Sequence, residues 1–299
     1  MIIDRKTTVF NSGCDAIVNT VNCRGVMGAG LALEFRLRYP EMFEQYKMDC
    51  KKGLVRIGEL RKYESDGAMI INFPTKDHWR EPSEISHIEK GLDYLVEHYK
   101  EWGISSIAIP PLGCSNGGLD FNIVGPIIHD KLKDLDIEVV ICVDPGFPEG
   151  KEKEMVDGYC SSDLVFVCDY LEIGGKQKNA IVKNGQIKRF FNILGINDVG
   201  TSTYEKLFCL YYSNNYKQLP SIEEMMTVQF KQSELPSIIE ELGIKGKEKS
   251  ILIDNQKKIN HFYELNDIVK SSTYRKLFVY FISKRDVRTS KQSSILGAW

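Results

Sequence analysis

The stretch that decides the fold is Asn19-Thr20-Val21-Asn22-Cys23-Arg24-Gly25-Val26-Met27-Gly28-Ala29-Gly30-Leu31-Ala32. An apolar strand runs into a loop with three glycines, and the loop runs directly into a predicted helix. Glycines allow the main chain to approach a ligand closely, and the first turn of a helix presents free N–H groups that suit a phosphate. The pattern indicates an α/β protein with a phosphate-binding turn, although many tight glycine turns bind nothing. The Asn22 amide either holds a sugar hydroxyl or caps its own loop.

Two more loops follow predicted strands in the same way. Their sequences are Asn72-Phe73-Pro74-Thr75-Lys76-Asp77-His78-Trp79-Arg80 and Pro110-Pro111-Leu112-Gly113-Cys114-Ser115-Asn116-Gly117-Gly118-Leu119-Asp120. In an open α/β sheet, loops at the carboxyl ends of the strands line the ligand crevice, so we expect the glycine-rich loops to clamp a diphosphate. Lys76 is a phosphate anchor, a nucleophile or a solvated charge. Asp120, considered alone, is most simply the N-cap of the next helix.

The first half of the chain alternates short β-rich runs with helical patterns, which is typical of an α/β layered sheet. The expected strands are Thr7–Phe10, Ala16–Val21, Leu54–Tyr63, Ala68–Phe73, Ser106–Pro110 and Ile137–Val143. The expected helices are Ala29–Tyr39, Glu41–Lys51, Ile85–Trp102 and Ile123–Leu135. The third helix has the clearest helical spacing of apolar residues, and Ser83 is its expected N-cap.

The second half is predicted to consist of short helices with polar connectors. A turn-rich and charged stretch, residues 144–154, marks the boundary between the halves. We therefore predict a first domain at residues 1–145, a connecting segment at 146–177 and a mainly α-helical domain at 178–299.

The helical domain contains an internal repeat. Residues 202–208 read Ser-Thr-Tyr-Glu-Lys-Leu-Phe and residues 272–278 read Ser-Thr-Tyr-Arg-Lys-Leu-Phe, with an Asn-Asp pair ahead of each copy. We interpret the matching residues as the core and caps of a duplicated helical module, because packing and capping residue types dominate among them. Two similar surfaces would also suit a partner with repeated features, such as a nucleic-acid backbone.

Composition excludes several classes of protein. Hydrophobic residues make up 42% and charged residues 27% of the chain, as in soluble globular proteins. The sequence has no apolar run of about eighteen residues and no signal peptide, so we expect a cytoplasmic protein without a membrane partner. Eight cysteines without a CxxC pair and five histidines without ligand spacing predict reduced thiols and no metal.

Charge is shared unevenly between the halves. Residues 1–150 hold 17 Lys+Arg and 23 Asp+Glu, a net charge of −6, whereas residues 151–299 hold 22 and 18, a net charge of +4. Neither half is basic enough to indicate nucleic-acid binding from charge alone.

Together the three loops resemble one family. The Asn-Thr-Val-Asn…Gly-Val-Met-Gly-x-Gly, Asn-Phe-Pro-Thr-Lys-x-His-Trp-Arg and Leu-Gly-Cys-x-x-Gly-Gly-Leu-Asp segments are similar to the macrodomain of the DarG antitoxin family, over residues 1–145. The resemblance implies a three-layer macrodomain, with a central mixed sheet flanked by helices. It also implies a glycohydrolase that removes ADP-ribose from thymidine in single-stranded DNA. This is a DNA-repair reaction that opposes a DarT-like ADP-ribosyltransferase toxin in a toxin–antitoxin or phage-defence pair.

The resemblance also implies a role for particular residues. Lys76 matches the catalytic lysine that attacks the anomeric carbon of the distal ribose, and Asp120 matches the acidic group that transfers a proton. Asn22 matches the asparagine beside that ribose. ADP-ribose is ligand and product, and neither a metal nor a cofactor is implied. The expected ligand-binding residues are Asn22, Gly28, Ala29, Gly30, Thr75, Gly113, Cys114, Ser115, Asn116, Gly117 and Gly118. Trp79 either stacks on an exposed thymine or closes the core beneath its loop.

One position departs from the family pattern. Many macrodomains carry Gly-Asp near the end of the first strand, where the Asp accepts a hydrogen bond from the adenine amino group, and this chain has Thr7-Thr8 there. This departure favours an alternative function, a module that senses ADP-ribose or a related nucleotide and regulates the helical domain. A third hypothesis is deacylation, or removal of ADP-ribose from protein, in the same pocket.

Overall fold

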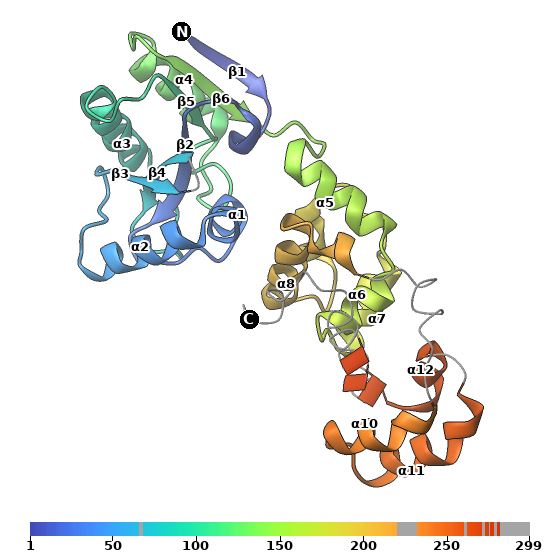
Figure 1. The fold of residues 1–299 in the computed structure, drawn as a ribbon. Coiled ribbons are helices and arrows are strands. Elements are labelled where there is room, and N and C mark those ends of the chain that lie inside the picture. The colour runs from blue at the N-terminus through green and yellow to red at the C-terminus, as the bar shows by residue number, and fades with distance from the viewer. Residues whose placement is uncertain are drawn as a thin grey trace. The chain divides into compact units, whose positions relative to one another are not determined.

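The computed structural model describes residues 1–65, 68–219, 232–259 and 262–270, and the pairs 273–274, 276–277 and 280–281. The chain divides into two compact units, Met1–Gly150 and Lys151–Trp299. Figure 1 shows the sheet in the first unit and helices in the second. Each unit is described separately below.

Unit 1 is built on a six-stranded mixed sheet with the strand order β1-β6-β5-β2-β4-β3. Neighbouring strands are parallel except β3 and β4, which are antiparallel. The strands are β1 (Ile2–Lys6), β2 (Ala16–Asn22), β3 (Arg61–Ser65), β4 (Ala68–Lys76), β5 (Ser106–Ile109) and β6 (Glu138–Val143). The helices are η1 (Val9–Asn11), α1 (Gly30–Arg38), α2 (Pro40–Lys51), α3 (Ile85–His98) and α4 (Phe121–Leu132).

Alternate residues of the central strands pack on opposite faces of this sheet. On β2, Ala16 and Val18 belong to one apolar core, with Ile88 of α3 and Ile128 of α4. Ile17 belongs to the other core, together with buried residues of α1 and α2. Both faces are therefore covered by helices, as expected for a largely parallel sheet. The prediction of a three-layer α/β unit with a mixed sheet is confirmed.

The structure corrects the expected first strand. Strand β1 is Ile2–Lys6, whereas the segment predicted as a strand, Thr7–Phe10, turns at Thr7 and enters the short helix η1. The β-branched residues suggested a strand, but tertiary context overrides such a propensity. β1 lies at the edge of the sheet and pairs only with β6, and an edge strand tolerates the charged residues that hid it.

Two smaller predictions in unit 1 are also wrong. The strand expected from Leu54 begins only at Arg61, after a turn in which Gly58 has a φ of 84°. Ser83 does not cap α3, because the N-cap position belongs to Glu84. The Ser83 backbone N–H instead donates to the Gly117 carbonyl at 2.9 Å, which ties the start of α3 to a glycine-rich loop.

Unit 2 is helical throughout the part that the structure describes. Its α-helices among the described residues are α5 (Gly150–Ser161), α6 (Leu164–Tyr170), α7 (Gly175–Lys183), α8 (Thr201–Tyr212), α10 (Leu235–Glu241), α11 (Gly246–Asn255) and α12 (Leu265–Ile268). Its 3-10 helices are η2 (Phe190–Gly195), η3 (Asn215–Gln218), η4 (Gln232–Glu234), η5 (Gln256–Lys258) and η6 (Phe262–Glu264). The expected connecting segment, 146–177, thus contains α5, α6 and the start of α7. No helix among the described residues is long and apolar enough to cross a membrane.

The internal repeat extends further than its shared motif. Helix α10 starts 71 residues after α6, and α11 starts 71 residues after α7. The backbone N–H groups of Thr203 and Tyr204 donate to the Gly200 carbonyl, and those of Thr273 and Tyr274 donate to the Lys270 carbonyl in the same way. Each copy is therefore a helix pair followed by a helical segment that carries the shared motif.

The shared apolar residues pack in separate cores. Tyr204 lies against Phe190 and Phe208, whereas Tyr274 and Leu277 belong to a core with Phe262. The interpretation of these residues as core is confirmed for those described; Ser272, Arg275 and Phe278 lie outside the described residues. The first Ser-Thr pair does not cap its helix, because the N-cap of α8 is Gly200 and the Thr203 hydroxyl donates to the Gln177 side chain.

Candidate active site

The carboxyl ends of β2 and β4 lie next to each other and bring two predicted site residues together. Asn22 is the last residue of β2 and pairs with Lys76, the last residue of β4, after a shift in register. Immediately beyond the strands, the Cys23 N–H donates to the Asp77 carbonyl at 2.9 Å. The loops that follow the two strands therefore start side by side, at the edge where parallel α/β sheets bind ligands.

Lys76 is buried rather than solvated. The residue is only 8% exposed, and its Nζ donates to the Asn116 carbonyl at 2.7 Å. Burial lowers the pKa of Lys76 below its usual value of 10.5, because desolvation disfavours the charged amine. Of the three interpretations of this lysine, the solvated surface charge is thus excluded.

The loop from Gly113 to Gly118 covers the Lys76 amine. A Cβ on Gly117 would lie 2.3 Å from both the Gly113 carbonyl oxygen and the Ser83 Oγ, so this position has room only for glycine. The loop is closed further by the Leu119 N–H, which donates to the Gly113 carbonyl at 3.0 Å. This tight packing holds the Asn116 carbonyl over Lys76.

The first and second glycine-rich loops converge, as the sequence predicts. A Cβ on Gly30 would lie 2.8 Å from the Asn116 Nδ2, so the two loops can approach only because residue 30 has no side chain. Ala29 is the N-cap residue of α1 and makes no side-chain capping bond. Gly28, Ala29 and Gly30 therefore lie at a helix start, where main-chain N–H groups can bind a phosphate.

The remaining predicted ligand-binding residues surround this convergence. Thr75 is buried in β4, one residue before Lys76. In the second loop, Ser115, Asn116 and Gly118 are exposed. The half-buried thiol of Cys114 has a raised pKa, first through desolvation and then through the negative charge of Asp120. Cys114 is thus held as a neutral thiol, which suits a binding residue better than a nucleophile.

Asn22 caps its own loop in this structure. Its Nδ2 donates to the Val26 carbonyl at 2.6 Å, and its Oδ1 accepts from the Arg24 N–H at 2.9 Å. The buried Tyr46 hydroxyl donates to the Asn22 carbonyl at 2.6 Å. The simpler of the two readings of this residue therefore holds, and its contact with a sugar stays a prediction.

Asp120 is the N-cap of α4, as its position alone suggests. Its Oδ1 accepts from the Asn122 N–H at 2.9 Å, and the residue is exposed. Capping uses only one carboxylate oxygen, so Asp120 is anchored by the helix while the other oxygen can serve a substrate. Asp120 follows Asn116, the residue that contacts Lys76, by four positions.

The side chains after Lys76 form an exposed rim. Trp79 is 45% exposed, so it does not close the core beneath its loop. The Arg80 guanidinium lies 4.4 Å from the centre of the Trp79 ring, and the His78 ring stacks on the same indole, with the ring centres 5.5 Å apart. Arg24, for which the sequence offers no role, forms an ion pair with Asp77.

A carboxylate missed by the sequence analysis lies at the end of β1. The Glu149 Oε2 accepts from the Thr7 hydroxyl at 3.0 Å and from the Thr8 N–H at 3.3 Å. Glu149 is far from Thr8 in the sequence, but it follows β6, the strand that pairs with β1. The pairing of β1 with β6, the first and last strands along the chain, would have revealed it.

Comparisons with known proteins agree on unit 1. The model of the Macro domain family matches residues 18–128. The chain is 48% identical over 146 residues to the DNA ADP-ribosyl glycohydrolase of Mycobacterium tuberculosis, covering 47% of this chain and 42% of that protein. It is 36% identical over 152 residues to a DNA ADP-ribosyl transferase-DNA ADP-ribosyl glycohydrolase fusion protein of Thermosipho africanus, covering 44% and 39%.

Among solved structures, the macrodomain of Mycobacterium tuberculosis DarG is 44% identical, with a TM-score of 0.47. That match covers 48% of this chain and 97% of the solved one. By contrast, the chain spans less than half the length of the two curated relatives named above.

Proposed function

We propose, from the premise that residues 18–128 are a macro domain, that this chain is a DNA ADP-ribosyl glycohydrolase. Its substrate would be single-stranded DNA that carries ADP-ribose on a thymidine base, and its products would be free ADP-ribose and repaired DNA. The observation that carries the proposal is the buried Lys76 amine with a lowered pKa, placed where two glycine-rich loops converge. The names of the relatives support the choice of DNA as the substrate.

Lys76 would act as the nucleophile. Only the neutral amine has a lone pair, and desolvation increases the neutral fraction. A neutral amine can still donate one N–H to the Asn116 carbonyl, which would orient the lone pair away from that carbonyl. Attack on the anomeric carbon of the distal ribose forms a carbon–nitrogen bond to Lys76 and breaks the bond between ribose and base. A water molecule then displaces Lys76 and yields ADP-ribose.

Asp120 would move the protons in these two steps. The departing base needs a proton, and the attacking water must lose one, so a carboxyl group can first donate and then accept. The α4 backbone holds Asp120 through one oxygen, leaving the second for this exchange. The main-chain N–H groups at Gly28–Gly30 and in the 113–118 loop would bind the diphosphate oxygens.

Adenine recognition would use Glu149. The family's usual aspartate is replaced by Thr8, but Glu149 Oε2 lies within 3.3 Å of the Thr8 backbone nitrogen. A carboxylate is thus present at the end of β1, although it comes from a different part of the chain. It would accept a hydrogen bond from the adenine amino group, as a carboxylate at this position does in the family.

An ADP-ribosyltransferase toxin would be the biological counterpart of this enzyme. The Thermosipho africanus relative carries the names of both activities in one fusion protein, which supports a functional link between transfer and removal. With DNA as the substrate, we expect this chain to act inside the cell as the antitoxin of a DarT-like toxin, in a toxin–antitoxin or phage-defence pair.

The experiment is a turnover assay with the full chain. We expect it to release ADP-ribose from a single-stranded oligonucleotide ADP-ribosylated on thymidine. Lys76→Ala should lower kcat/KM by at least about 10³-fold, as expected when a nucleophile is removed. Lys76→Arg distinguishes the remaining roles, because arginine keeps the charge of a phosphate anchor but cannot be a neutral nucleophile. We expect Lys76→Arg to be as inactive as Lys76→Ala, while the exposed Lys100→Ala retains full activity.

Two outcomes would contradict the enzyme proposal. In the first, the modification persists undiminished, and Lys76→Ala is indistinguishable from the parent chain. In the second, calorimetry shows that ADP-ribose binds but no modified DNA or protein is turned over. The second outcome would support the alternative, a nucleotide sensor that regulates unit 2.

A further inference from the structure

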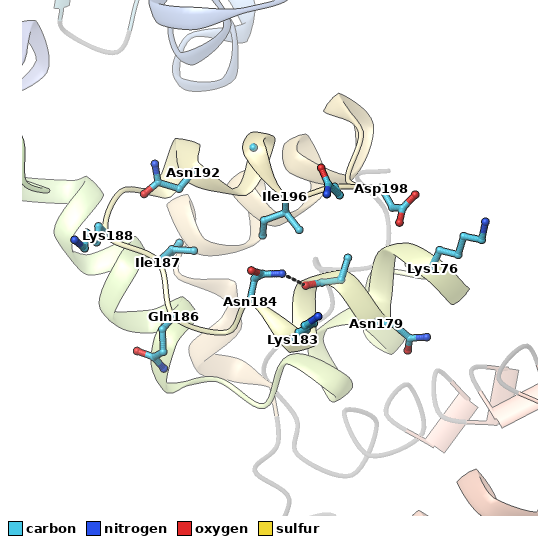
Figure 2. A pocket seen from close by; sticks show the side chains of 13 residues that line it. Lys176, Asn179, Lys183, Asn184, Gln186, Ile187, Lys188, Asn192, Ile196 and Asp198 are labelled. Atoms are coloured by element: carbon cyan, nitrogen blue, oxygen red, sulfur yellow. Dashed lines mark hydrogen bonds between the residues drawn. The ribbon is translucent and has the colours of Figure 1, made fainter.

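Unit 2 contains an open pocket of about 910 Å³ that belongs to no part of the site described above. Its walls are α7 and the chain that follows this helix, up to Asp198 in the loop before α8. Figure 2 shows the side chains that line it, all of them from unit 2. The pocket is therefore formed entirely within one compact unit.

Three lysines line this pocket. In the view of Figure 2, Lys188 and Lys176 lie toward opposite ends, and Lys183 lies between them. Lys176 and Lys183 are seven residues apart on α7, about 10 Å at the rise of an α-helix. All three are exposed, and none makes an ion pair with any described residue. Asp198 is the one acidic residue among the described residues that line the pocket.

Some lysines of unit 2 are paired with carboxylates. On the same helix, Lys178 contacts both oxygens of Asp169 at 2.7 Å, and on α5, Lys151 and Lys153 each pair with an acidic residue. The three lysines of the pocket are not neutralised in this way, so their positive charges are available to an anionic ligand.

Amide and apolar groups complete the lining. Asn179 and Asn197 make no side-chain hydrogen bond with the residues that the structure describes, and both are exposed in the pocket wall. Ile187 and Ile196 also line the pocket and are half-buried. A lining of ammonium groups, unused amides and an apolar surface suits a ligand that has both anionic and flat apolar parts.

We propose that this pocket binds single-stranded DNA through its phosphodiester backbone. Lysines are compact point charges that contact phosphates without fixed geometry, and amides bind phosphates and base edges. In choosing DNA rather than RNA, the inference rests on the proposed function of unit 1. That unit has a net charge of −6 and repels a polyanion, whereas unit 2 has a net charge of +4 and can supply the attraction.

An exposed aromatic residue next to the pocket supports a single strand. Phe191 is 49% exposed and directly precedes Asn192, which lines the pocket. The Arg189 guanidinium lies 5.2 Å from the centre of the Phe191 ring. Single-strand binders combine a positive groove with aromatic rings on which unpaired bases stack, and a duplex would not offer its bases to Phe191.

The second copy of the repeat lacks this row of lysines. At the offset of 71 residues that relates α7 to α11, Lys176 corresponds to Lys247, but Lys183 corresponds to Asp254. The row is therefore not a requirement of the helical module, which folds with a carboxylate at the same position. It is a surface feature of the first copy alone, as expected for a binding site.

Binding of an unmodified oligothymidylate of about 15 nucleotides tests the proposal, since this length covers a typical single-strand site. The full chain and the triple variant Lys176→Gln, Lys183→Gln, Lys188→Gln are titrated by fluorescence anisotropy at several salt concentrations. We expect the variant to bind at least about tenfold more weakly at low salt. Its salt slope should fall by about 2, because each phosphate contact on a single strand contributes about 0.7.

The matched control removes three exposed lysines from the second copy, as Lys245→Gln, Lys247→Gln, Lys249→Gln. It changes the net charge equally, so it should bind almost as tightly as the parent chain. Equal binding by the pocket variant and the parent, or equal losses in pocket and control variants, would overturn the proposal. Displacement of the oligonucleotide by polyglutamate of matched charge would instead assign the pocket to an acidic protein.

The test is independent of catalysis. Failure of unit 1 as an enzyme would appear as lost hydrolysis with intact oligothymidylate binding. Failure of the pocket proposal would appear as unchanged binding in the triple variant, whether or not the chain hydrolyses modified DNA. Circular dichroism melting of the variants verifies that exposed lysines were replaced without unfolding unit 2.

Discussion

The lysines of the two units are used in opposite ways. In unit 1, Lys76 is buried, bonded to a carbonyl and shifted toward its neutral form. In unit 2, Lys176, Lys183 and Lys188 are exposed and face an open pocket. Burial makes an amine chemically reactive, whereas exposure keeps its charge available for attraction. This contrast agrees with the two proposals made above, that unit 1 hydrolyses the modified DNA and that unit 2 binds the single strand.

The largest expected effect comes from destabilising unit 2 alone, which tests whether the two units fold independently. Glu152 is buried in unit 2, where its carboxylate accepts from Arg189 Nε at 2.9 Å and from the Phe190 N–H at 3.0 Å. Glu152→Ala leaves the Arg189 charge buried without this carboxylate. We expect the free energy of unfolding of unit 2 to fall by about 3–5 kcal/mol. Hydrogen exchange resolved along the chain should show lost protection in unit 2 and unchanged protection in unit 1.

The control for this variant is Glu154→Ala. Glu154 is exposed and pairs with Lys151 on the surface of the same helix, so its removal should leave the exchange pattern as it is. Loss of protection in both units after Glu152→Ala would show that they fold as one, and the comparison between them would then lose its basis.

A smaller effect is expected from the loop that covers Lys76. In Gly117→Ala, the new Cβ would lie 2.3 Å from the Gly113 carbonyl oxygen, so the loop must shift and carry the Asn116 carbonyl away from Lys76. Misplacement of catalytic groups by about 1 Å lowers the reaction rate about 10²-fold, and we expect kcat/KM to fall by a similar factor. Oligothymidylate binding, assigned to unit 2, should stay at the parental level.

Gly103→Asn is the companion variant. Gly103 lies outside the site, has a φ of 70° with no neighbour within 4 Å, and asparagine tolerates this left-handed conformation better than most residues. It should hydrolyse modified DNA at nearly the parental rate. Parental turnover by Gly117→Ala would show that the position of Asn116 does not matter to the reaction.

The sequence predicts unit 1 far better than unit 2, for a physical reason. Glycine-rich turns such as those around Gly30 and Gly117 are dictated by close backbone approach, which leaves a local signal in the sequence. The same is true of the buried strands β2 and β4, each of which begins with an apolar run. By contrast, β1 was misplaced because an edge strand needs no apolar run.

Other features depend on contacts between distant residues. The Glu149 carboxylate reaches Thr8 only because β6 pairs with β1, and Ser83 is held by Gly117 rather than by its own helix. In unit 2, the repeated residues such as Tyr204 and Tyr274 were recognisable as core. The pocket was not predictable from the repeat, because Lys183 has no lysine counterpart in the second copy.

The smallest expected effect is the pH dependence of turnover. The rate of hydrolysis should change at most about tenfold per pH unit, which corresponds to about 1.4 kcal/mol. Protonated Lys76 has no lone pair, so hydrolysis should rise with pH until Lys76 is neutral, and level off below the usual lysine pKa of 10.5 because burial lowers it. Single-turnover rates from about pH 6 to about pH 9 measure this rise. Oligothymidylate binding requires charge rather than a free amine, so it should not increase over the same range. A rate that falls as the pH rises would mean that Lys76 acts as a cation, and the contrast between the lysines of the two units would disappear.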